Sequence, residues 1–247
     1  MTAPLLIAED LNKNFGGIRA VADLNLSVDP GEVLGVIGPN GAGKTTVLNL
    51  LSGLTRPSRG RIFVGGVDLT GRPAHAFARH GVARTFQNIR LFRTMTVLEN
   101  VLGGMHLRRI SGAAARREGL DLLSSFGLTN VAEQPAGSLA YGLQRRLEIA
   151  RAIAARPRIL LLDEPAAGMN AAESEELTVL IRWVCREYGV SIVVIEHHMD
   201  VVMNLCQRIL VLDHGILIAA GTPDQVKQDP RVIEVYLGGD DLDAAAG

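Results

Sequence analysis

The sequence predicts an α/β fold: a mainly parallel β-sheet with packed helices, an antiparallel β patch, and a helical lobe inserted in the core. Three observations predict it. Short β-branched runs alternate with helical segments, the first part of the chain is strand-like with glycine-rich turns, and the middle has few strand signals. At 247 residues, with 47% hydrophobic and 21% charged residues, the chain has the size and composition of a single globular domain.

The parallel sheet is predicted from near-continuous apolar runs, because a strand buried on both faces shows no polar alternation. These runs are residues 31–37, 158–162, 190–195 and 208–212. Helical patterns lie between them, at residues 45–52, 144–155, 172–188 and 200–206. Alternation of this kind is typical of α/β proteins with parallel strands.

The remaining regions predict the other parts of the fold. Residues 1–30 and 60–67 are strand-like with glycine-rich turns and indicate the antiparallel patch. The alanine, leucine and arginine content after Gln87 indicates a helical lobe over about residues 88–137. The core is then expected at about residues 1–87 and 138–237, followed by a flexible tail at 238–247 that is rich in glycine, aspartate and alanine.

Composition excludes several classes of protein. The net charge is −1, whereas nucleic-acid binders usually carry a net basic field, so we expect no nucleic-acid partner. Two cysteines, Cys185 and Cys206, are too few for a disulfide framework and indicate a reducing compartment. We find no signal peptide pattern and no apolar run near the roughly 18–20 residues of a membrane span. We expect a protein that is soluble, or bound to a membrane through a partner.

The strongest motif is a phosphate-binding loop at residues 38–45, which fits G-x-x-x-x-G-K-[ST] between a predicted strand and a predicted helix. Its glycines let successive backbone N–H groups turn toward one point, and the helix adds its positive end. Lys44 is expected to reach the β- and γ-phosphates, and the Thr45 hydroxyl to ligate Mg²⁺. The predicted nucleotide-binding residues here are Gly38, Pro39, Asn40, Gly41, Ala42, Gly43, Lys44, Thr45 and Thr46.

Two acids end the apolar run Leu160-Leu161-Leu162. They are expected at the carboxyl edge of the sheet, where ligands bind in open α/β folds. Asp163 is then placed to hold Mg²⁺, and Glu164 to orient or deprotonate a water that attacks the γ-phosphate.

A phosphate loop alone leaves kinases, GTPases, helicases and transport ATPases open. From about residue 5 to 238 the chain resembles the ATP-binding-cassette ATPases. The resemblance implies a P-loop NTPase core that binds ATP and Mg²⁺. It also implies roles for three residues: Phe15 stacks on adenine, Gln87 senses Mg²⁺ and the γ-phosphate, and His197 is the switch histidine.

The resemblance extends to a signature segment at residues 139–143, LAYGL, and a following loop at 167–170, AGMN. The family's usual signature is LSGGQ, so Ala140, Tyr141 and Leu143 depart from it, and Asn170 stands where aspartate is common. Gly142 and a helix expected to begin near Gln144 could still present N–H groups to the phosphates of a partner's ATP. Loss of a polar side chain at Leu143 predicts weaker pairing of two cassettes.

Several segments look like the ATPases of branched-chain amino acid importers: residues 82–92, 139–151, 163–170, 195–200 and 235–238. This likeness implies two membrane permeases, a second (F-type) cassette ATPase or a second copy in a head-to-tail dimer, and indirectly a solute-binding protein. The protein would lie peripherally on the cytoplasmic face of the inner membrane. Residues 88–137, with Gln87 at their base, would dock the permeases.

The identity of the transported solute stays open, because the solute never touches the ATPase subunit of such an importer. Urea, amide and other amino-acid importers use similar ATPases. A non-transport cassette ATPase is disfavoured, since the sequence shows neither the heptads of a long coiled coil nor excess basic charge.

Overall fold

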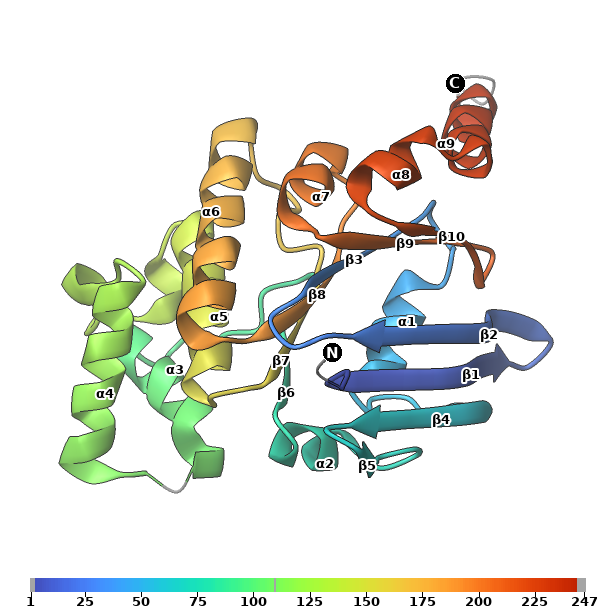
Figure 1. Ribbon diagram of the computed structural model, residues 1–247. Coiled ribbons are helices and arrows are strands. Elements are labelled where there is room, and N and C mark those ends of the chain that lie inside the picture. Colours follow the sequence, from blue (N-terminus) through green and yellow to red (C-terminus); the bar gives the residue numbers. More distant parts are fainter. Residues whose placement is uncertain (1–2, 109, 244–247) are drawn as a thin grey trace.

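A computed structural model describes residues 3–108 and 110–243 (Figure 1). Its main sheet has the strand order β10-β9-β3-β8-β7-β6. Every neighbouring pair is parallel except β9 and β10. The strands are β3 (Val33–Ile37), β6 (Val82–Arg84), β7 (Ile159–Asp163), β8 (Ser191–Ile195), β9 (Arg208–Asp213) and β10 (Ile216–Gly221). The predicted α/β class with a parallel sheet is confirmed.

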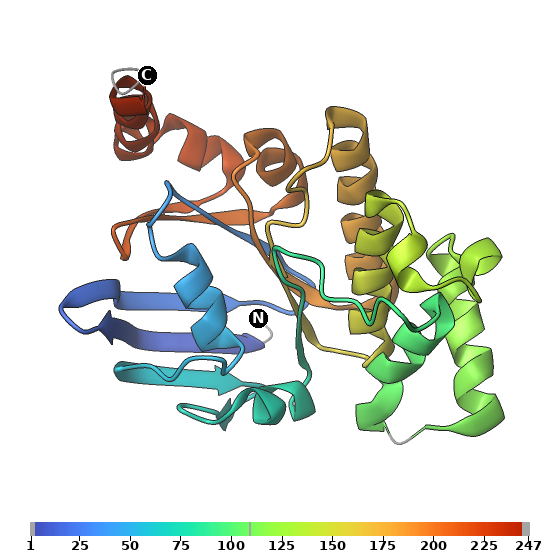
Figure 2. The same ribbon diagram turned by 180° about the vertical axis from the view of Figure 1, so that it is seen from behind.

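The second sheet is antiparallel and has the order β2-β1-β4-β5. Its strands are β1 (Leu6–Phe15), β2 (Ile18–Val28), β4 (Arg59–Val64) and β5 (Val67–Asp68). It lies beside the parallel sheet, with α1 between the two in both views (Figures 1 and 2). This sheet is the antiparallel patch that the glycine-rich turns predicted.

The helices include the expected ones and several that the sequence pattern did not predict. The α-helices are α1 (Lys44–Leu51), α2 (Ala74–Arg79), α3 (Val97–Gly104), α4 (Gly112–Ser125), α5 (Tyr141–Ala154), α6 (Ala171–Tyr188), α7 (Met199–Leu205), α8 (Pro223–Gln228) and α9 (Pro230–Asp243). Short 3-10 helices lie at Met105–Arg108, Thr129–Val131 and Ala136–Ser138. Helix α5 begins at Tyr141, three residues before the expected start near Gln144, so the signature segment forms its first turn.

Two strands of the main sheet, β6 and β10, were not predicted. Strand β6 has three residues and lies at the sheet edge, too short for a pattern. Strand β10 forms a hairpin with β9 through His214 and Gly215, which have φ values of 44° and 80°. Two positive φ values in a two-residue loop are the geometry of a type I′ turn.

Apolar side chains fill both faces of the parallel sheet. On one face, β-strand residues such as Leu160 and Val194 pack with α5, α6, α7 and the helices α3 and α4. On the other face, residues such as Leu161 and Val193 pack with α1 and the antiparallel sheet. Burial on both faces explains the continuous apolar runs in the sequence.

The chain ends in α9, which continues through Gly238 and Gly239 to Asp243. The flexible tail expected from residue 238 is therefore helical as far as Asp243, and residues 244–247 lie outside the described residues. Proline at the first position of a helix is favourable, and two glycines cost about 1 kcal/mol each relative to alanine without ending a helix. Among the helices formed by residues 3–108 and 110–243, none is both long and apolar enough to span a bilayer.

Helix α3 packs closely on α5 through Gly104. A Cβ atom built at Gly104 would lie 2.2 Å from the Arg151 carbonyl oxygen, whereas one at the exposed neighbour Gly103 would meet only Phe92, at 3.7 Å. Gly104→Ala should therefore lower the free energy of unfolding by about 1–3 kcal/mol through overpacking. Gly103→Ala is the matched control and should leave stability unchanged or slightly raised. Urea denaturation of both variants measures this, and equal effects would contradict the close approach.

Candidate functional site

The phosphate loop connects β3 to α1 and is built on glycines with positive φ. Gly38, Gly41 and Gly43 have φ values of 148°, 80° and 95°. A Cβ at Gly38 would lie 2.0 Å from the Leu212 carbonyl oxygen, and one at Gly43 would lie 2.3 Å from that of Ala20. The loop therefore requires glycine both for its backbone conformation and for its contacts. It leads into the first turn of α1, whose N–H groups lack partners within the helix and can bind an anion.

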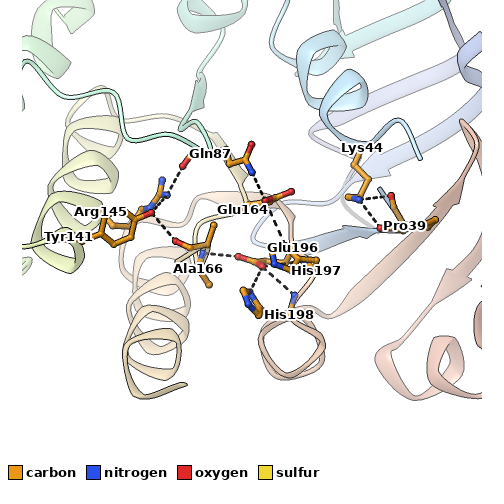
Figure 3. A network of polar contacts seen from close by, with 12 residues as sticks. Pro39, Lys44, Gln87, Tyr141, Arg145, Glu164, Ala166, Glu196, His197 and His198 are labelled. Atoms are coloured by element: carbon orange, nitrogen blue, oxygen red, sulfur yellow. Dashed lines mark hydrogen bonds and ion pairs between the residues drawn. The ribbon is translucent and has the colours of Figure 1, made fainter. Parts of the chain in front are cut away.

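Lys44 lies at the start of α1 and folds over the loop (Figure 3). Its Nζ donates to the carbonyl oxygens of Gly38 at 2.6 Å and Pro39 at 2.8 Å. Burial lowers the pKa of Lys44, while the nearby carboxylates of Glu164 and Asp163 act in the opposite direction. The ammonium group thus lies between the loop and the two acids, where phosphate oxygens would replace its carbonyl partners.

Phe15 ends β1 and is half exposed. Lys13 Nζ lies 4.8 Å from its ring centroid. Phe15 pairs with Ile18 at the hairpin, and Ala20, two residues further along β2, contacts Gly43 of the phosphate loop. The hairpin that carries this exposed ring therefore contacts the phosphate loop through Ala20, and the role of Phe15 on adenine stays a prediction.

Asp163 ends β7 in a buried ion pair. Its Oδ2 lies 2.8 Å from Arg84 Nη2, and both side chains are almost fully buried. Arg84 Nη1 also donates to Asn49 Oδ1 at 2.7 Å and to Ser52 Oγ at 3.1 Å. Burial lowers the pKa of Arg84, and the hydrogen bond that Arg84 donates to Asp163 opposes that shift. Sequence reasoning missed Arg84, although a charge in an apolar edge strand is a signal for a buried partner.

Gln87 and His197 both approach Glu164 (Figure 3). Gln87 Nε2 donates to Glu164 Oε2 at 2.8 Å, and His197 Nδ1 lies 3.7 Å from the same oxygen. Glu164 itself has a φ of 45°, a conformation that costs about 1–3 kcal/mol in a non-glycine residue and clusters at functional sites. The three residues predicted to be catalytic therefore lie together, at the carboxyl edge of the sheet and beside Lys44.

The signature segment differs in detail from the sequence expectation. Gly142 lies in the first turn of α5, and a Cβ atom built there would meet no other atom within 4 Å. Leu143 packs against the apolar core. Since the side chain is partly buried on its own chain, weaker pairing of two cassettes through a lost polar contact stays a prediction. Asn170 caps α6 by accepting from Glu173 N, with Glu173 bonding back, a role that asparagine and aspartate fill equally well.

A buried ion pair fixes the segment that follows β6. In α5, Arg145 Nη1 lies 2.8 Å from Glu148 Oε2, and both side chains are almost completely inaccessible to solvent. Arg145 donates to the carbonyl oxygens of Phe86 and Gln87, each at 2.9 Å, and Glu148 Oε1 accepts from Arg90 N at 3.0 Å. Helix α5 thus holds the backbone that positions Gln87. These contacts could not be predicted from the sequence, because arginine and glutamate in a helix usually face water.

Glu196 is a second buried carboxylate that sequence reasoning missed. It accepts from Ala166 N at 2.7 Å, from His197 N at 3.2 Å, and lies 3.2 Å from His198 Nδ1 (Figure 3). Strand β8 ends at Ile195, so His197 and His198 are beyond the strand and their rings lie side by side, with centroids 4.2 Å apart. Glu196 therefore links the segment after Glu164 to the segment that carries His197.

The site combines a glycine-rich loop that leads into a helix with two acids at a nearby strand end. A glutamine and a histidine lie against the second of these acids. These features together define the site of a P-loop nucleotide-binding ATPase. Residues 21–167 match the ABC transporter family, and residues 217–241 match a segment described as that of a branched-chain amino acid ATP-binding cassette transporter. The chain belongs to the ABC transporter family, as an ATP-binding cassette.

Curated relatives match nearly the whole chain. It is 44% identical to the high-affinity branched-chain amino acid transport ATP-binding protein BraF of Pseudomonas aeruginosa, over 96% of this chain and 99% of that protein. It is 45% identical to LivG of Escherichia coli K12, a protein of the same description, with the same coverage. The lipopolysaccharide export ATP-binding protein LptB of Haemophilus influenzae is 36% identical over 95% of this chain and 97% of that protein.

Solved structures agree with the fold. A cassette of an ABC transporter in its ADP conformation superposes with a TM-score of 0.87 at 29% identity, covering 96% of this chain and all of that chain. A nucleotide-free cassette superposes with a TM-score of 0.85 at 28% identity, over 95% of this chain and 99% of that chain. The expected P-loop cassette fold is confirmed.

The Arg84–Asp163 pair allows a stability prediction. Arg84→Met leaves a buried carboxylate without its partner, which should lower the free energy of unfolding by about 3–5 kcal/mol. The control is Arg116→Met, which breaks the pair with Glu133 at 2.7 Å, where both side chains are more than half exposed. That change should cost less than about 1 kcal/mol. Urea denaturation measures the free energy of unfolding of both variants. A decrease in Arg84→Met as small as that in Arg116→Met would show that the charge of Asp163 needs no partner.

Proposed function

We propose that this chain is the ATP-binding and ATP-hydrolysing subunit of an importer that takes up branched-chain amino acids. The observation that carries the catalytic part is the convergence of Gln87 and His197 on Glu164, beside Lys44 of the phosphate loop. Similarity to BraF and LivG, together with the match over residues 217–241, supports the branched-chain class of solute.

Residues of the loop bind the triphosphate of ATP. Backbone N–H groups of the loop, from residues 40–46, surround the phosphates, the ammonium of Lys44 neutralises the β- and γ-phosphates, and Phe15 stacks on the adenine. The Asp163 carboxylate, the Thr45 hydroxyl and the Gln87 amide oxygen form an oxygen donor set that suits Mg²⁺. When bound, Mg²⁺ neutralises charge that develops on the phosphate oxygens.

Glu164 acts on the water that attacks the γ-phosphorus. Its carboxylate orients the water or accepts its proton while ADP leaves, and the Gln87 amide holds that carboxylate in place. His197, on the other side of Glu164 Oε2, hydrogen-bonds the γ-phosphate. All of these groups come from ends of neighbouring strands or the segments that follow them, so their relative positions are fixed by the sheet.

A partner chain completes the site. The amino-terminal turn of α5, with Gly142, presents N–H groups to the ATP held by a second cassette. That cassette is an F-type ATPase of the same transporter or a second copy of this chain, in head-to-tail pairing. The arrangement encloses each ATP between two chains and excludes water.

Membrane permeases dock near the helical lobe. A cavity of about 270 Å³ lies beside Arg84 and Phe86, lined also by Leu54, Leu107 and Arg151. The exposed ring of Phe92 lies 5.5 Å from the Arg151 guanidinium. These groups border the segment that carries Gln87, so a permease bound here senses the γ-phosphate through it. The protein is thus peripheral on the cytoplasmic face of the membrane, with no direct contact to the solute-binding protein.

The function is tested by reconstitution. The chain, its partner ATPase and the two permeases in proteoliposomes should take up radiolabelled leucine, isoleucine or valine in an ATP-dependent way once a binding protein is added. Uptake of urea, amides or other amino acids in place of these would assign the transporter to another solute and leave the ATPase role intact.

Glu164→Gln keeps the size and hydrogen bonding of the side chain but removes its charge and basicity. ATP hydrolysis should fall by about 10²–10⁴-fold, while Mg·ATP binding persists and the closed dimer accumulates. Lys44→Ala should instead lose nucleotide affinity. Turnover, ATP binding and dimerisation are measured for both, with the partner ATPase present. Near-wild-type turnover in Glu164→Gln would exclude this residue as the catalytic carboxylate.

Phe92→Ala should reduce transport and assembly with the permeases several-fold, because truncating a well-placed aromatic anchor commonly costs more than 1 kcal/mol of binding. ATP binding to the isolated chain should not change. Ile233→Ala, at an exposed apolar residue of α9, is the control. Co-purification with the permeases is the measurement, and retention equal to wild type would place the docking surface elsewhere.

A further inference from the structure

Tyr141 places a phenol where the cassette pattern has a glycine, and its hydroxyl has two partners. The hydroxyl donates to the Ala167 carbonyl oxygen at 2.8 Å and accepts from Arg145 Nη2 at 3.3 Å. Its ring is partly exposed at the start of α5. One side chain thus joins the first turn of the signature helix to the loop at residues 167–170 (Figure 3).

Arg145 gives this hydroxyl a fixed neighbour. The guanidinium is buried, ion-paired with Glu148, and bonded to the carbonyl oxygens of Phe86 and Gln87. Tyr141 therefore extends a rigid group that already holds the backbone of Gln87. Movement of the first turn of α5 therefore breaks one of the two hydrogen bonds of the Tyr141 hydroxyl, or carries the Ala167 segment or the Gln87 backbone with it.

The other end of the contact is tied to Glu164. Ala167 N donates to the Glu164 carbonyl oxygen at 3.1 Å, in a turn directly after the catalytic carboxylate. The preceding amide, Ala166 N, donates to buried Glu196, which also binds the amide of His197. Ala167 thus belongs to a short segment whose position affects both Glu164 and His197.

We propose that the Tyr141 hydroxyl is a positioning group that couples the two ATP sites of the paired cassettes. The inference rests on the proposed function, in which the first turn of α5 contacts the partner's ATP while Glu164, Gln87 and His197 act on this chain's own. Contact of the signature turn with the partner's nucleotide is transmitted through the Tyr141–Ala167 bond to the segment after Glu164. Tyr141 touches neither the water nor the phosphate, so it acts through this segment alone.

The test compares Tyr141→Phe with Tyr188→Phe. The second change removes a hydroxyl from an aromatic cluster of Phe126, Trp183 and Tyr188 outside this network. Hydrogen exchange of the peptide containing residues 165–170 is measured first, in the nucleotide-free chain. Loss of one neutral hydrogen bond should speed its exchange by about two- to tenfold in Tyr141→Phe, with no change in Tyr188→Phe or in the unfolding midpoint of either.

The second measurement is the ATP dependence of hydrolysis in the assembled transporter. Coupling between sites appears as a Hill coefficient above 1, and Tyr141→Phe should bring that value toward 1, while ATP affinity of the isolated chain changes by less than about twofold. Unchanged hydrogen exchange at residues 165–170 would show that the Tyr141–Ala167 hydrogen bond does not hold this segment. Faster exchange with an unchanged Hill coefficient would overturn the coupling between the two ATP sites. Both outcomes leave the ATPase function standing, whereas a wild-type transporter with no ATP-dependent uptake overturns the proposed function and this inference with it.

Discussion

The parallel pairing of β7 with β6 on one side and β8 on the other determines where the polar groups of the site lie. Arg84 pairs in register with Leu161, and Asp163 with Ile195. Because parallel strands end at one edge, Glu164, Gln87 and His197 leave the sheet within a few residues of its carboxyl end. The phosphate loop follows β3, which pairs with β8. Four separate segments of the chain meet there without any long loop.

This arrangement concentrates charge in a partly buried place, and the structure compensates for it locally. Arg84 neutralises Asp163, and Lys44 lies between the loop carbonyl oxygens and the two acids. Desolvation lowers the pKa of Lys44, while the acids oppose the shift. A triphosphate entering the site brings negative charge toward a cation that is incompletely solvated, and this favours binding by a preorganised group.

Helix α5 connects this charge network to the rest of the molecule. It packs on α3 at Gly104, holds the Gln87 backbone through buried Arg145 and Glu148, and presents its first turn at the surface. A single rigid helix therefore borders the proposed permease surface, holds the backbone of Gln87 and carries the turn that would meet a partner's nucleotide. A movement of this helix would affect all three, and this is how we propose that hydrolysis is coupled to transport.

The sequence by itself determined the fold class, four strands of the main sheet (β3, β7, β8 and β9), the phosphate loop, and the acids at the end of β7. Each depends on a local pattern: continuous apolar runs, glycines at positions whose backbone conformation other residues rarely adopt, and polar residues that end a buried strand. The tertiary structure decided the partners of Arg84, Arg145, Glu148 and Glu196, the inward direction of Leu143, and the helical end of the chain to Asp243. Those features depend on which side chains from distant segments share a buried space. A charged residue on a helix or edge strand has the same local pattern whether it faces water or a buried carbonyl oxygen, so only the packing of the whole chain distinguishes the two.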